Sequence, residues 1–245
     1  MKMFWAKGPN PGNVGDLIGP YLYEKDTGQK PEWDRKRSLI VCGSIARFAQ
    51  PNTTVWGAGC IRGGENLCTE ADWRMVRGPR TRDRLAELGV ECNTMADPAL
   101  FLPFVYPKDP DYIGGETYCC VPHYVDLDHK ATQDDGCVSP VTDDVEGFID
   151  RICMHGVVMS SSLHGIIIAH AYGIPAMWVE FSDGVVGEGW KFRDYFDSIG
   201  VMDAKPMDLR EEKYLPFGWH VGHYVVQPPD RTDLAALWET RPWNT

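Results

Sequence analysis

Residues 157–175 constrain the fold of this chain more than any other stretch. They run from a short apolar segment through three serines to His164-Gly165, and then through a second apolar segment to Gly173. Pro175 follows, and after it a further apolar run over residues 176–179. This order predicts a strand, a turn, a helix and a strand. The turn lies at the carboxyl end of a strand, where open α/β sheets bind their ligands.

The turn itself carries candidate binding groups. Ser160, Ser161 and Ser162 are followed by His164 at the start of the predicted helix. Hydroxyls, an imidazole and the free N–H groups of a helix N-terminus together suit the binding of an anion. The alternative is that the serines cap the helix and that His164 packs in the core. The sequence leaves both interpretations open.

Further short apolar runs predict a parallel sheet around this unit. Strands are expected at residues 2–6, 38–42, 53–56, 75–76 and 117–123, and helices at residues 17–24, 79–88, 143–153, 191–200 and 233–239. Several of these strands end in turns rich in glycine or arginine, which is typical of an α/β fold with its loops on one edge. Residues 104–116 are rich in Pro, Gly and Asp and form the best candidate linker. They divide the chain into an N-terminal domain, residues 1–106, and a C-terminal domain, residues 107–245.

The glycine-punctuated loop over residues 8–16 is a second candidate binding element. Its small residues let a backbone approach a ligand closely, and Asn13 and Asp16 can hold polar groups. The glycine spacing does not match G-x-G-x-x-G, so a dinucleotide site is not predicted. An ordinary capped loop explains the same residues.

The charge distribution points to a small, local anion. The formal net charge of −11 argues against general binding to nucleic acid or anionic lipid. One segment breaks the trend with five arginines in eleven residues: Arg74, Arg77, Arg80, Arg82 and Arg84. Pairs within a helix, such as Arg84 with Glu87, offer a structural alternative. That alternative does not reach Arg77, which precedes the Gly78-Pro79 break.

Cysteine spacing and hydropathy exclude several classes of protein. The eight cysteines form no Cys-x-x-Cys pair and no Cys/His set at zinc spacing, so reduced structural thiols and no metal site are expected. No apolar run approaches the roughly 20 residues that span a bilayer. The first residues are too short for a signal peptide. The protein is therefore expected in the cytoplasm.

Motifs spread over residues 1–200 resemble the polysaccharide pyruvyltransferase family, and most closely its bacterial exopolysaccharide ketal-pyruvate transferases. The matching segments, in order, are Gly12-Asn-Val-Gly-Asp16, Trp56-Gly-Ala-Gly59, Val76-Arg-Gly-Pro-Arg-Thr81, Asp97-Pro98, Pro122-His123, Ser160-Ser-Ser-Leu-His-Gly165, Ala171-Tyr-Gly-Ile-Pro175 and Lys191-Phe-Arg-Asp-Tyr195. Each element alone is weak, whereas the ordered set is specific.

The resemblance implies two Rossmann-like lobes that face a central cleft, as in the GT-B glycosyltransferases, with the acceptor side on the N-terminal lobe and the donor side on the C-terminal lobe. It also implies transfer of pyruvate from phosphoenolpyruvate to two hydroxyls of one sugar, in a polysaccharide or its precursor, which gives a cyclic ketal. Phosphoenolpyruvate is then a co-substrate, and no metal or other cofactor is expected. For a lipid-linked saccharide acceptor, peripheral association with the inner face of the membrane is expected.

Two features depart from the family pattern. Many relatives read Ser-x-Arg-x-His-Gly, and here the Arg position is Ser162. A positive charge that could hold phosphate is therefore missing from the motif, so another residue supplies it or the donor differs. The chain is also short for the family, which suggests trimmed acceptor loops.

The residues divide into candidate roles on this basis. Arg77 and Lys191 are expected to bind the acidic groups of the donor, because phosphate and carboxylate need fixed cationic donors. The same donor site is expected to include Arg80, Ser160, Ser161 and Ser162. Asn13, Asp16 and His123 are assigned to the acceptor, with Asp16 as a base for a sugar hydroxyl.

His164 is the predicted catalytic residue, together with Arg77 and Asp16. It is expected to protonate the methylene carbon of the donor or to bind the departing phosphate. His170 falls on another face of the same helix and is expected to pack in the core.

Two other function classes remain open on the sequence. A glycosyltransferase with a nucleotide-sugar donor could use the same two-lobe cleft, with Glu180 or Glu188 as the carboxylate that binds ribose. A non-catalytic saccharide-binding relative is the third possibility, because the motif lacks its Arg.

Overall fold

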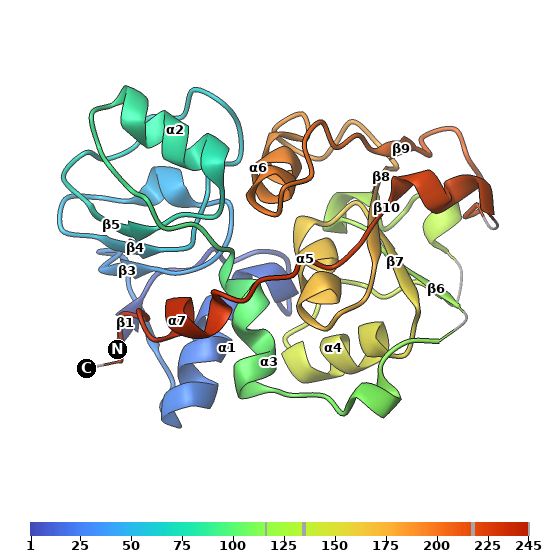
Figure 1. Cartoon of the computed structure of the whole chain (residues 1–245), viewed down its shortest axis with the longest axis horizontal. Helices are drawn as coiled ribbons and strands as arrows, with labels where there is room; N and C mark the ends of the chain where they lie inside the picture. Colours follow the sequence, from blue (N-terminus) through green and yellow to red (C-terminus); the bar gives the residue numbers. More distant parts are fainter. Residues whose placement is uncertain (116, 134–135, 217–218, 245) are drawn as a thin grey trace.

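A computed structural model describes residues 1–115, 117–133, 136–216 and 219–244. Within it the chain forms two groups of parallel strands with helices packed around them, so the predicted α/β class is confirmed (Figure 1). One residue of the predicted linker, Glu116, lies outside the described residues.

The N-terminal group of strands comes from the first 75 residues. β3 (Leu39–Ile40), β4 (Thr54–Trp56) and β5 (Asp72–Met75) pair in parallel in that order. β1 (Lys2–Met3) pairs with β2 (Glu32–Trp33), and a single bridge from Phe4 to Ile40 joins β1 to the β3 side. β1, β3 and β4 are shorter than the predicted strands, whereas β5 begins three residues earlier than predicted.

The C-terminal sheet has the order β10-β8-β7-β6, with β9 paired to β8. Its strands are β6 (Tyr118–Val121), β7 (Val157–Ser160), β8 (Ala176–Glu180), β9 (Met207–Asp208) and β10 (Val225–Val226). All pair in parallel except β10, which is antiparallel to β8. The strand, turn, helix and strand predicted for residues 157–179 are therefore confirmed as β7, α5 (Leu163–Ala171) and β8.

The other helices are α2 (Pro79–Glu87), α3 (Leu102–Val105), α4 (Val145–Cys153), α6 (Trp190–Ser198) and α7 (Leu234–Trp238). They lie where the sequence predicted them, except α3, which was not predicted and overlaps the start of the predicted linker. Short 3₁₀ turns link them: η1 (Ala46–Phe48), η2 (Pro98–Phe101), η3 (Pro110–Tyr112), η4 (Tyr124–Asp126), η5 (Lys130–Thr132) and η6 (Trp219–Tyr224).

Helix α1 (Val14–Thr27) is longer than predicted and runs through Gly19-Pro20. Pro20 is the seventh residue of the helix, beyond the first turn, so it lacks the N–H that would donate to the carbonyl oxygen of Asp16 and it destabilises the helix locally. Asn13 caps the N-terminus by accepting the N–H of Gly15 at 3.0 Å. Tertiary packing of the apolar face outweighs the weak intrinsic propensity of this segment.

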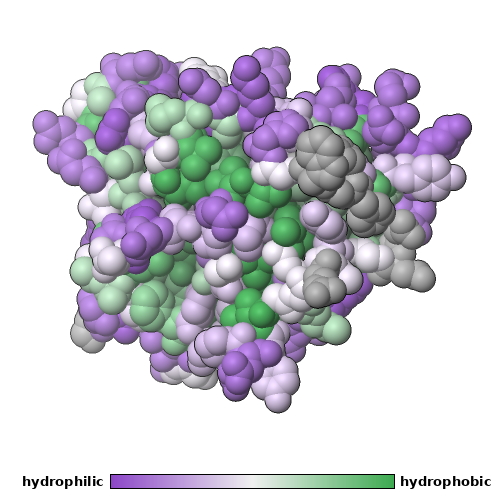
Figure 2. Space-filling model, turned by 45° about the vertical axis from the view of Figure 1, so that its right-hand side comes forward, coloured by the Kyte–Doolittle hydropathy of each residue, from purple (hydrophilic) through white to green (hydrophobic). Residues whose placement is uncertain are grey.

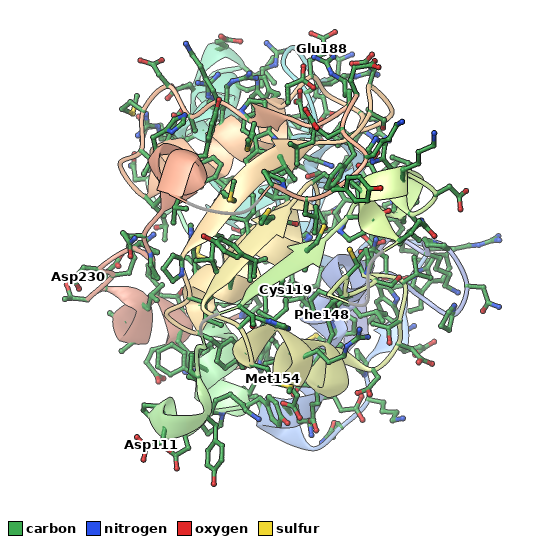
Figure 3. All side chains as sticks on the ribbon, turned by 90° about the vertical axis from the view of Figure 1, so that its right-hand side faces the viewer. Asp111, Cys119, Phe148, Met154, Glu188 and Asp230 are labelled. Atoms are coloured by element: carbon green, nitrogen blue, oxygen red, sulfur yellow. The ribbon has the colours of Figure 1, made fainter. Side chains whose placement is uncertain are left out.

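The largest hydrophobic core draws on both halves of the chain. Helix α1 packs against α4 and α5 of the C-terminal half, so Ile18 and Leu22 share a core with Phe148 and Cys119. Figure 3 shows Phe148 of α4 beside Cys119 of β6. The division into two domains near residue 106 stays a prediction. Among the described residues, no helix combines the length and the apolar character needed to cross a membrane.

Candidate active site

A cavity of 340 Å³ brings together most of the predicted site residues. It is lined by the loop before α1, by the turns after β1 and β3, and by the start of α5. The residues that carry candidate chemistry there are Asn13, Asp16, His123, Ser162, His164 and Lys191. The loop over residues 8–16 and the His164 turn therefore face one space, as predicted. Figure 2 shows hydrophilic residues over the raised parts of one face and hydrophobic residues in its recessed parts.

Lys191 places a cation in this cavity. It lies in the first turn of α6 and only 7% of its surface is exposed. Among the described residues its Nζ has no hydrogen-bond or ion-pair partner, and it lies 5.5 Å from the centroid of the Phe192 ring. Burial, reinforced by the charge of Arg77, lowers the pKa of Lys191 to about 8. A largely desolvated ammonium without a partner is suited to an anionic ligand.

Asp16 is the acidic counterpart of Lys191. Burial raises the pKa of Asp16 to about 6, and the charge of Lys191 opposes this shift. Among the described residues its carboxylate accepts no hydrogen bond, since Asn13 rather than Asp16 caps α1. The capping explanation for Asp16 is therefore wrong. A carboxyl group with a pKa near neutrality can act as a general base.

His123 and Asn13 complete the polar wall of the cavity. The His123 Nδ1 accepts the N–H of Val125 at 3.4 Å, which assigns the proton of the neutral ring to Nε2. Burial, with a further contribution from Lys191, lowers the pKa of His123 to about 3. His123 is thus a neutral hydrogen-bonding group, and the side-chain N–H₂ of Asn13 is a second neutral donor.

His164 lies in the first turn of α5 and packs directly on Gly15. A β-carbon at Gly15 would clash with the His164 Nδ1, so only glycine lets α1 approach the ring this closely. The other ring nitrogen, Nε2, lies 3.4 Å from the Cys42 Sγ and 3.9 Å from the Asp97 Oδ2. Burial lowers the pKa of His164, whereas the charge of Asp97 raises it. The packing interpretation for His164 is incomplete, because the ring also lines the cavity.

Two of the three serines serve the fold instead of the cavity. The Ser160 Oγ is buried and lies 2.7 Å from the carbonyl oxygen of Val121, and it accepts the N–H of Ser162 at 3.0 Å. The Ser161 Oγ donates to the Asp126 carboxylate at 2.6 Å and accepts the N–H of His123 at 2.8 Å. Their predicted contact with substrate is not supported, since these hydroxyls are already engaged.

Ser162 is the serine that lines the cavity. It occupies the N-cap position of α5 and its side chain makes no capping hydrogen bond. The N–H groups of the first helical turn therefore have no side-chain acceptor at this end. The prediction of an anion at the α5 N-terminus is compatible with this geometry and stays a prediction.

Arg77 does not reach the cavity, which corrects its assignment to the donor. Its guanidinium is fully buried and donates to the Asp194 carboxylate at 3.0 Å, to the Ser44 Oγ at 2.9 Å and to the Cys60 carbonyl oxygen at 2.6 Å. Thr81 donates its N–H and its hydroxyl to the same carboxylate, at 2.9 and 2.8 Å. We call this buried network of Arg77, Thr81 and Asp194 the α2–α6 joint.

Arg80 belongs to the same interface between α2 and α6. Its Nε donates to the Asp197 carboxylate at 2.6 Å, and its side chain remains 35% exposed. A β-carbon at Gly78 would clash with the backbone of Asp194, so glycine is required where the two helices meet. The prediction that Arg80 binds substrate is therefore not supported. The two sequence motifs around Arg77 and Lys191 dock on each other.

Glu180 lies in a different and larger cavity of 570 Å³, together with Trp178, Ser182 and Arg193. Burial raises the pKa of Glu180, and the charge of Arg210 opposes the shift. This cavity shares none of its lining with the one that holds Asp16 and His164. The larger volume does not make this cavity the active site, because Asp16 and Lys191, which have no hydrogen-bond partner among the described residues, line the 340 Å³ cavity instead.

His170 is a packing residue, as predicted. It is buried, its Nδ1 lies 2.8 Å from the Tyr195 hydroxyl and its Nε2 lies 3.2 Å from the carbonyl oxygen of Val226. Burial lowers its pKa to about 4.

Sequence reasoning missed several residues at the site. Arg47 and Ser44 line the cavity from the turn after β3, and Asp97 and Cys42 lie behind His164. The Asp97-Pro98 pair was visible as a motif, but nothing in the sequence placed it beside His164. Cys42 carried no signal beyond its position at the end of a strand.

A comparison with protein families agrees with the ordered motifs. The family model of the polysaccharide pyruvyl transferases matches residues 15–183. An uncharacterised protein of Acanthamoeba polyphaga mimivirus is 33% identical over 214 residues, covering 77% of this chain and 71% of that protein. A solved structure of an uncharacterised protein from Klebsiella pneumoniae has a TM-score of 0.45 at 13% identity, and covers 89% of this chain and 92% of the other. The family match spans the greater part of the chain and includes Asp16, Asp97 and His164, so the protein belongs to the polysaccharide pyruvyl transferase family.

Proposed function

We propose that the protein transfers the pyruvyl group of phosphoenolpyruvate to two hydroxyls of a saccharide and forms a cyclic ketal in the 340 Å³ cavity. The proposal rests on the position of Lys191 and Asp16, which line the same cavity as His164. Among the described residues, neither Lys191 nor Asp16 has a side-chain hydrogen-bond partner. Family membership supports pyruvyl transfer, and the cavity supplies the charges that this chemistry needs. The proposed reaction uses the two substrates and no further cofactor. The GT-B-like arrangement of two lobes is part of the same proposal.

Lys191 is the proposed partner for the acidic groups of the donor. Phosphoenolpyruvate carries a phosphate and a carboxylate, so it requires at least two positive or N–H-rich contacts. Lys191 supplies one, and Arg47, which lies 3.8 Å from the Glu65 carboxylate and is 40% exposed, supplies a second from the turn after β3. The free N–H groups at the start of α5 add a third. Together they replace the charge that Ser162 does not provide.

Asp16 is the proposed base for the acceptor. It shares the cavity wall with Asn13, whose amide can hold a neighbouring hydroxyl of the sugar. In the transfer, a hydroxyl loses its proton to Asp16 while its oxygen bonds to the second carbon of the donor. The methylene carbon gains a proton from His164, the bond from the second carbon to the phosphate oxygen breaks, and the oxygen of the second hydroxyl bonds to the same carbon while its proton leaves with the phosphate as hydrogen phosphate.

His164 is the proposed source of the proton on the methylene carbon. Its Nε2 faces Asp97 and Cys42, whereas Nδ1 packs on Gly15 and accepts or donates no side-chain hydrogen bond among the described residues. Asp97 stabilises the protonated ring electrostatically, and a bound dianionic donor would act in the same direction. The proton is therefore held more firmly once the donor is present.

The decisive experiment measures phosphate release from phosphoenolpyruvate against a panel of hexose acceptors. We expect saccharide-dependent release, and His164→Ala is expected to cut kcat by about 10²–10⁴-fold, as for loss of general acid catalysis. His164→Gln distinguishes the two roles, because glutamine can hydrogen-bond phosphate without transferring a proton. Near-native turnover in His164→Gln would exclude the acid role and retain a binding role.

The matched control is His155→Gln, at an imidazole outside the cavity that lies 2.9 Å from the Thr117 hydroxyl. It is expected to turn over at the wild-type rate. Absence of phosphate release with every acceptor would contradict the proposed function.

The aromatic packing of the larger cavity disfavours the glycosyltransferase alternative. A nucleotide base would need an open aromatic face, but Trp178 stacks on Phe192 with centroids 4.6 Å apart and has the Arg193 guanidinium 5.2 Å from its ring. A thermal-shift panel with phosphoenolpyruvate, UDP and UDP-sugars separates the two donors. Stabilisation by UDP alone would favour the glycosyltransferase.

A further inference from the structure

We propose that Cys42, Asp97 and His164 form a binding site for a thiophilic divalent cation such as Zn²⁺, and that the cation competes with the proton for His164. The three residues come from separate parts of the chain: the end of β3, the N-cap of η2 and the first turn of α5. Binding of the cation is independent of the proposed function. Only its effect on turnover, which is inhibition, rests on that function.

The separations between the ligand atoms fit a single ion. The Cys42 Sγ lies 3.4 Å from the His164 Nε2 and 3.6 Å from the Asp97 Oδ1, and the His164 Nε2 lies 3.9 Å from the Asp97 Oδ2. Tetrahedral zinc, with bonds of about 2.0–2.3 Å, holds such ligand atoms roughly 3.4–3.6 Å apart. The sulfur–nitrogen separation matches this range, the two carboxylate distances refer to different oxygens of Asp97, and one ligand atom from each residue lies within 4.8 Å of the others. Binding through Oδ2 requires the His164 Nε2 and that oxygen to approach by about half an ångström.

Asp97 supplies an independent sign that a partner belongs at this point. Its side chain is fully buried, and its Oδ1 accepts the N–H of Ala99 at 2.9 Å. Its Oδ2 is buried and accepts no hydrogen bond among the described residues. A buried carboxylate oxygen without a partner is costly, and either a cation or the proton of His164 would satisfy it.

The donor set selects the class of ion. A thiolate, an imidazole and a carboxylate suit Zn²⁺ and similar borderline-soft ions, and do not suit Mg²⁺ or Ca²⁺, which prefer oxygen. Binding replaces the proton on the Cys42 sulfur by a metal–sulfur bond and releases that proton to solvent. One thiolate and one carboxylate then balance the two charges of the ion, so the buried assembly is neutral.

The position of His164 connects this site to turnover. His164 lines the 340 Å³ cavity, whereas Cys42 and Asp97 are buried behind it. An ion therefore approaches from the cavity, past the ring that it finally binds. A metal on Nε2 excludes a proton on the same nitrogen, so the imidazolium cannot form and transfer stops.

Cobalt(II) provides a direct readout, because a cobalt–thiolate bond gives a charge-transfer absorption in the near ultraviolet. The full-length protein, cleared of metal by a chelator, is titrated with Co²⁺ and then with competing Zn²⁺. We expect one Co²⁺ per chain with a thiolate band, displaced by Zn²⁺. Cys42→Ser and Cys42→Ala should each remove the band and weaken binding by at least about tenfold.

The matched control is Cys92→Ser, at a buried thiol whose sulfur lies 3.7 Å from the carbonyl oxygen of Thr94 and outside the 340 Å³ cavity. It should keep the band and the affinity. Circular dichroism identifies any variant that fails to fold, and two substitutions at Cys42 guard against that failure. An unchanged cobalt spectrum in a folded Cys42 variant, or no spectral change in the wild type, would overturn the site.

Inhibition is measured separately, as the ratio of phosphate release with and without Zn²⁺ within each variant. Wild type and Cys92→Ser should be inhibited, and the Cys42 variants should lose at least about tenfold in sensitivity. If the cobalt band is present while no variant releases phosphate, the metal site stands and the proposed function fails. Equal zinc sensitivity in all variants would contradict competition at His164.

Discussion

Helix α6 carries two charged residues one turn apart, and their surroundings are opposites. Asp194 lies in the α2–α6 joint, where Arg77 and Thr81 satisfy its carboxylate completely. Lys191 faces the cavity, and among the described residues it has no polar partner. The sequence predicted that Arg77 and Lys191 both bind the acidic groups of the donor, and of these two only Lys191 lines the cavity. Both residues are charged, so residue type does not distinguish a structural role from a ligand-binding role. The number of hydrogen bonds that each side chain makes does.

The ion pair of Arg77 with Asp194 and the ammonium of Lys191 also affect the stability of the fold differently. A buried ion pair with all its hydrogen bonds made is expensive to break, because removal of one partner leaves the other charge uncompensated. A buried ammonium without a partner lowers the stability of the folded state, so its presence points to a ligand. The α2–α6 joint links the two halves of the chain, whereas Lys191 and Asp16 in the cavity can still bind a ligand.

The largest effect is expected at the joint. Arg77→Ala leaves the fully buried carboxylate of Asp194 without its cation and should lower the free energy of unfolding by about 3–5 kcal/mol. Urea denaturation followed by circular dichroism measures this change. Arg80→Ala is the matched control at the same interface between α2 and α6, where the arginine side chain is 35% exposed, so loss of its pair with Asp197 should cost less, about 1 kcal/mol. If Arg77→Ala and Arg80→Ala lower the free energy of unfolding equally, the α2–α6 joint is no more stabilising than the pair of Arg80 with Asp197.

An intermediate effect is expected for Lys191→Met, which should weaken donor binding but stabilise the folded protein. The donor KM should rise by about 10–100-fold, in line with loss of a charge-assisted contact of roughly 1.5–3 kcal/mol. The folded protein should become more stable at neutral pH. A lysine pKa lowered from 10.5 to about 8 corresponds to a cost of about 3 kcal/mol below pH 8.

The pH dependence of the free energy of unfolding tests whether Lys191 destabilises the folded protein. Because the folded-state pKa of Lys191 is depressed, the unfolded chain binds more protons between pH 8 and 10.5, so the wild type gains stability as pH rises through this window. The advantage of Lys191→Met should therefore shrink above pH 8. A variant that is less stable than the wild type at pH 7 would mean that Lys191 is part of the architecture, like Arg77.

The smallest effect concerns the acidic limb of the pH–rate profile. Asp16 must be ionised to accept a proton, and burial raises its pKa to about 6, so kcat/KM should fall tenfold per pH unit below about pH 6. Removal of the cation in Lys191→Met should move this limb to higher pH, because Lys191 lowers the pKa of Asp16. His123→Asn should leave the limb in place, since the pKa of His123 is about 3. A profile that stays flat down to pH 5 would rule out Asp16 as the base.

Most secondary structure followed from local patterns, and the exceptions have physical causes. Periodicity and glycine stops predicted α2, α4, α5 and α6, and apolar runs predicted the central strands. The two-residue strands β2, β9 and β10 are too short to show a period and depend on their neighbours for pairing. Helix α1 was underestimated because Gly19-Pro20 weakens its propensity, while the packing that restores it comes from residues more than 100 positions away.

The candidate site was recognisable only in part. Motifs identified Asn13, Asp16, His164 and Lys191, which the structure brings to one cavity. Arg77 was misassigned because its partner Asp194 is 117 residues away, and no local rule links the two. Cys42 and Asp97 were missed for the same reason, since their relation to His164 exists only after both sheets have formed.

The packing of α1 against the C-terminal half has a consequence for synthesis on the ribosome. Ile18 and Leu22 are fully buried against a core that includes α4 and α5, yet the last residue of α5, Ala171, is translated 144 residues after Thr27. At about 5–20 residues per second, the apolar face of α1 waits roughly 7–29 s for its partners. The nascent N-terminal half therefore leaves the ribosome with an uncovered apolar surface, which a chaperone can bind or a neighbouring chain can trap.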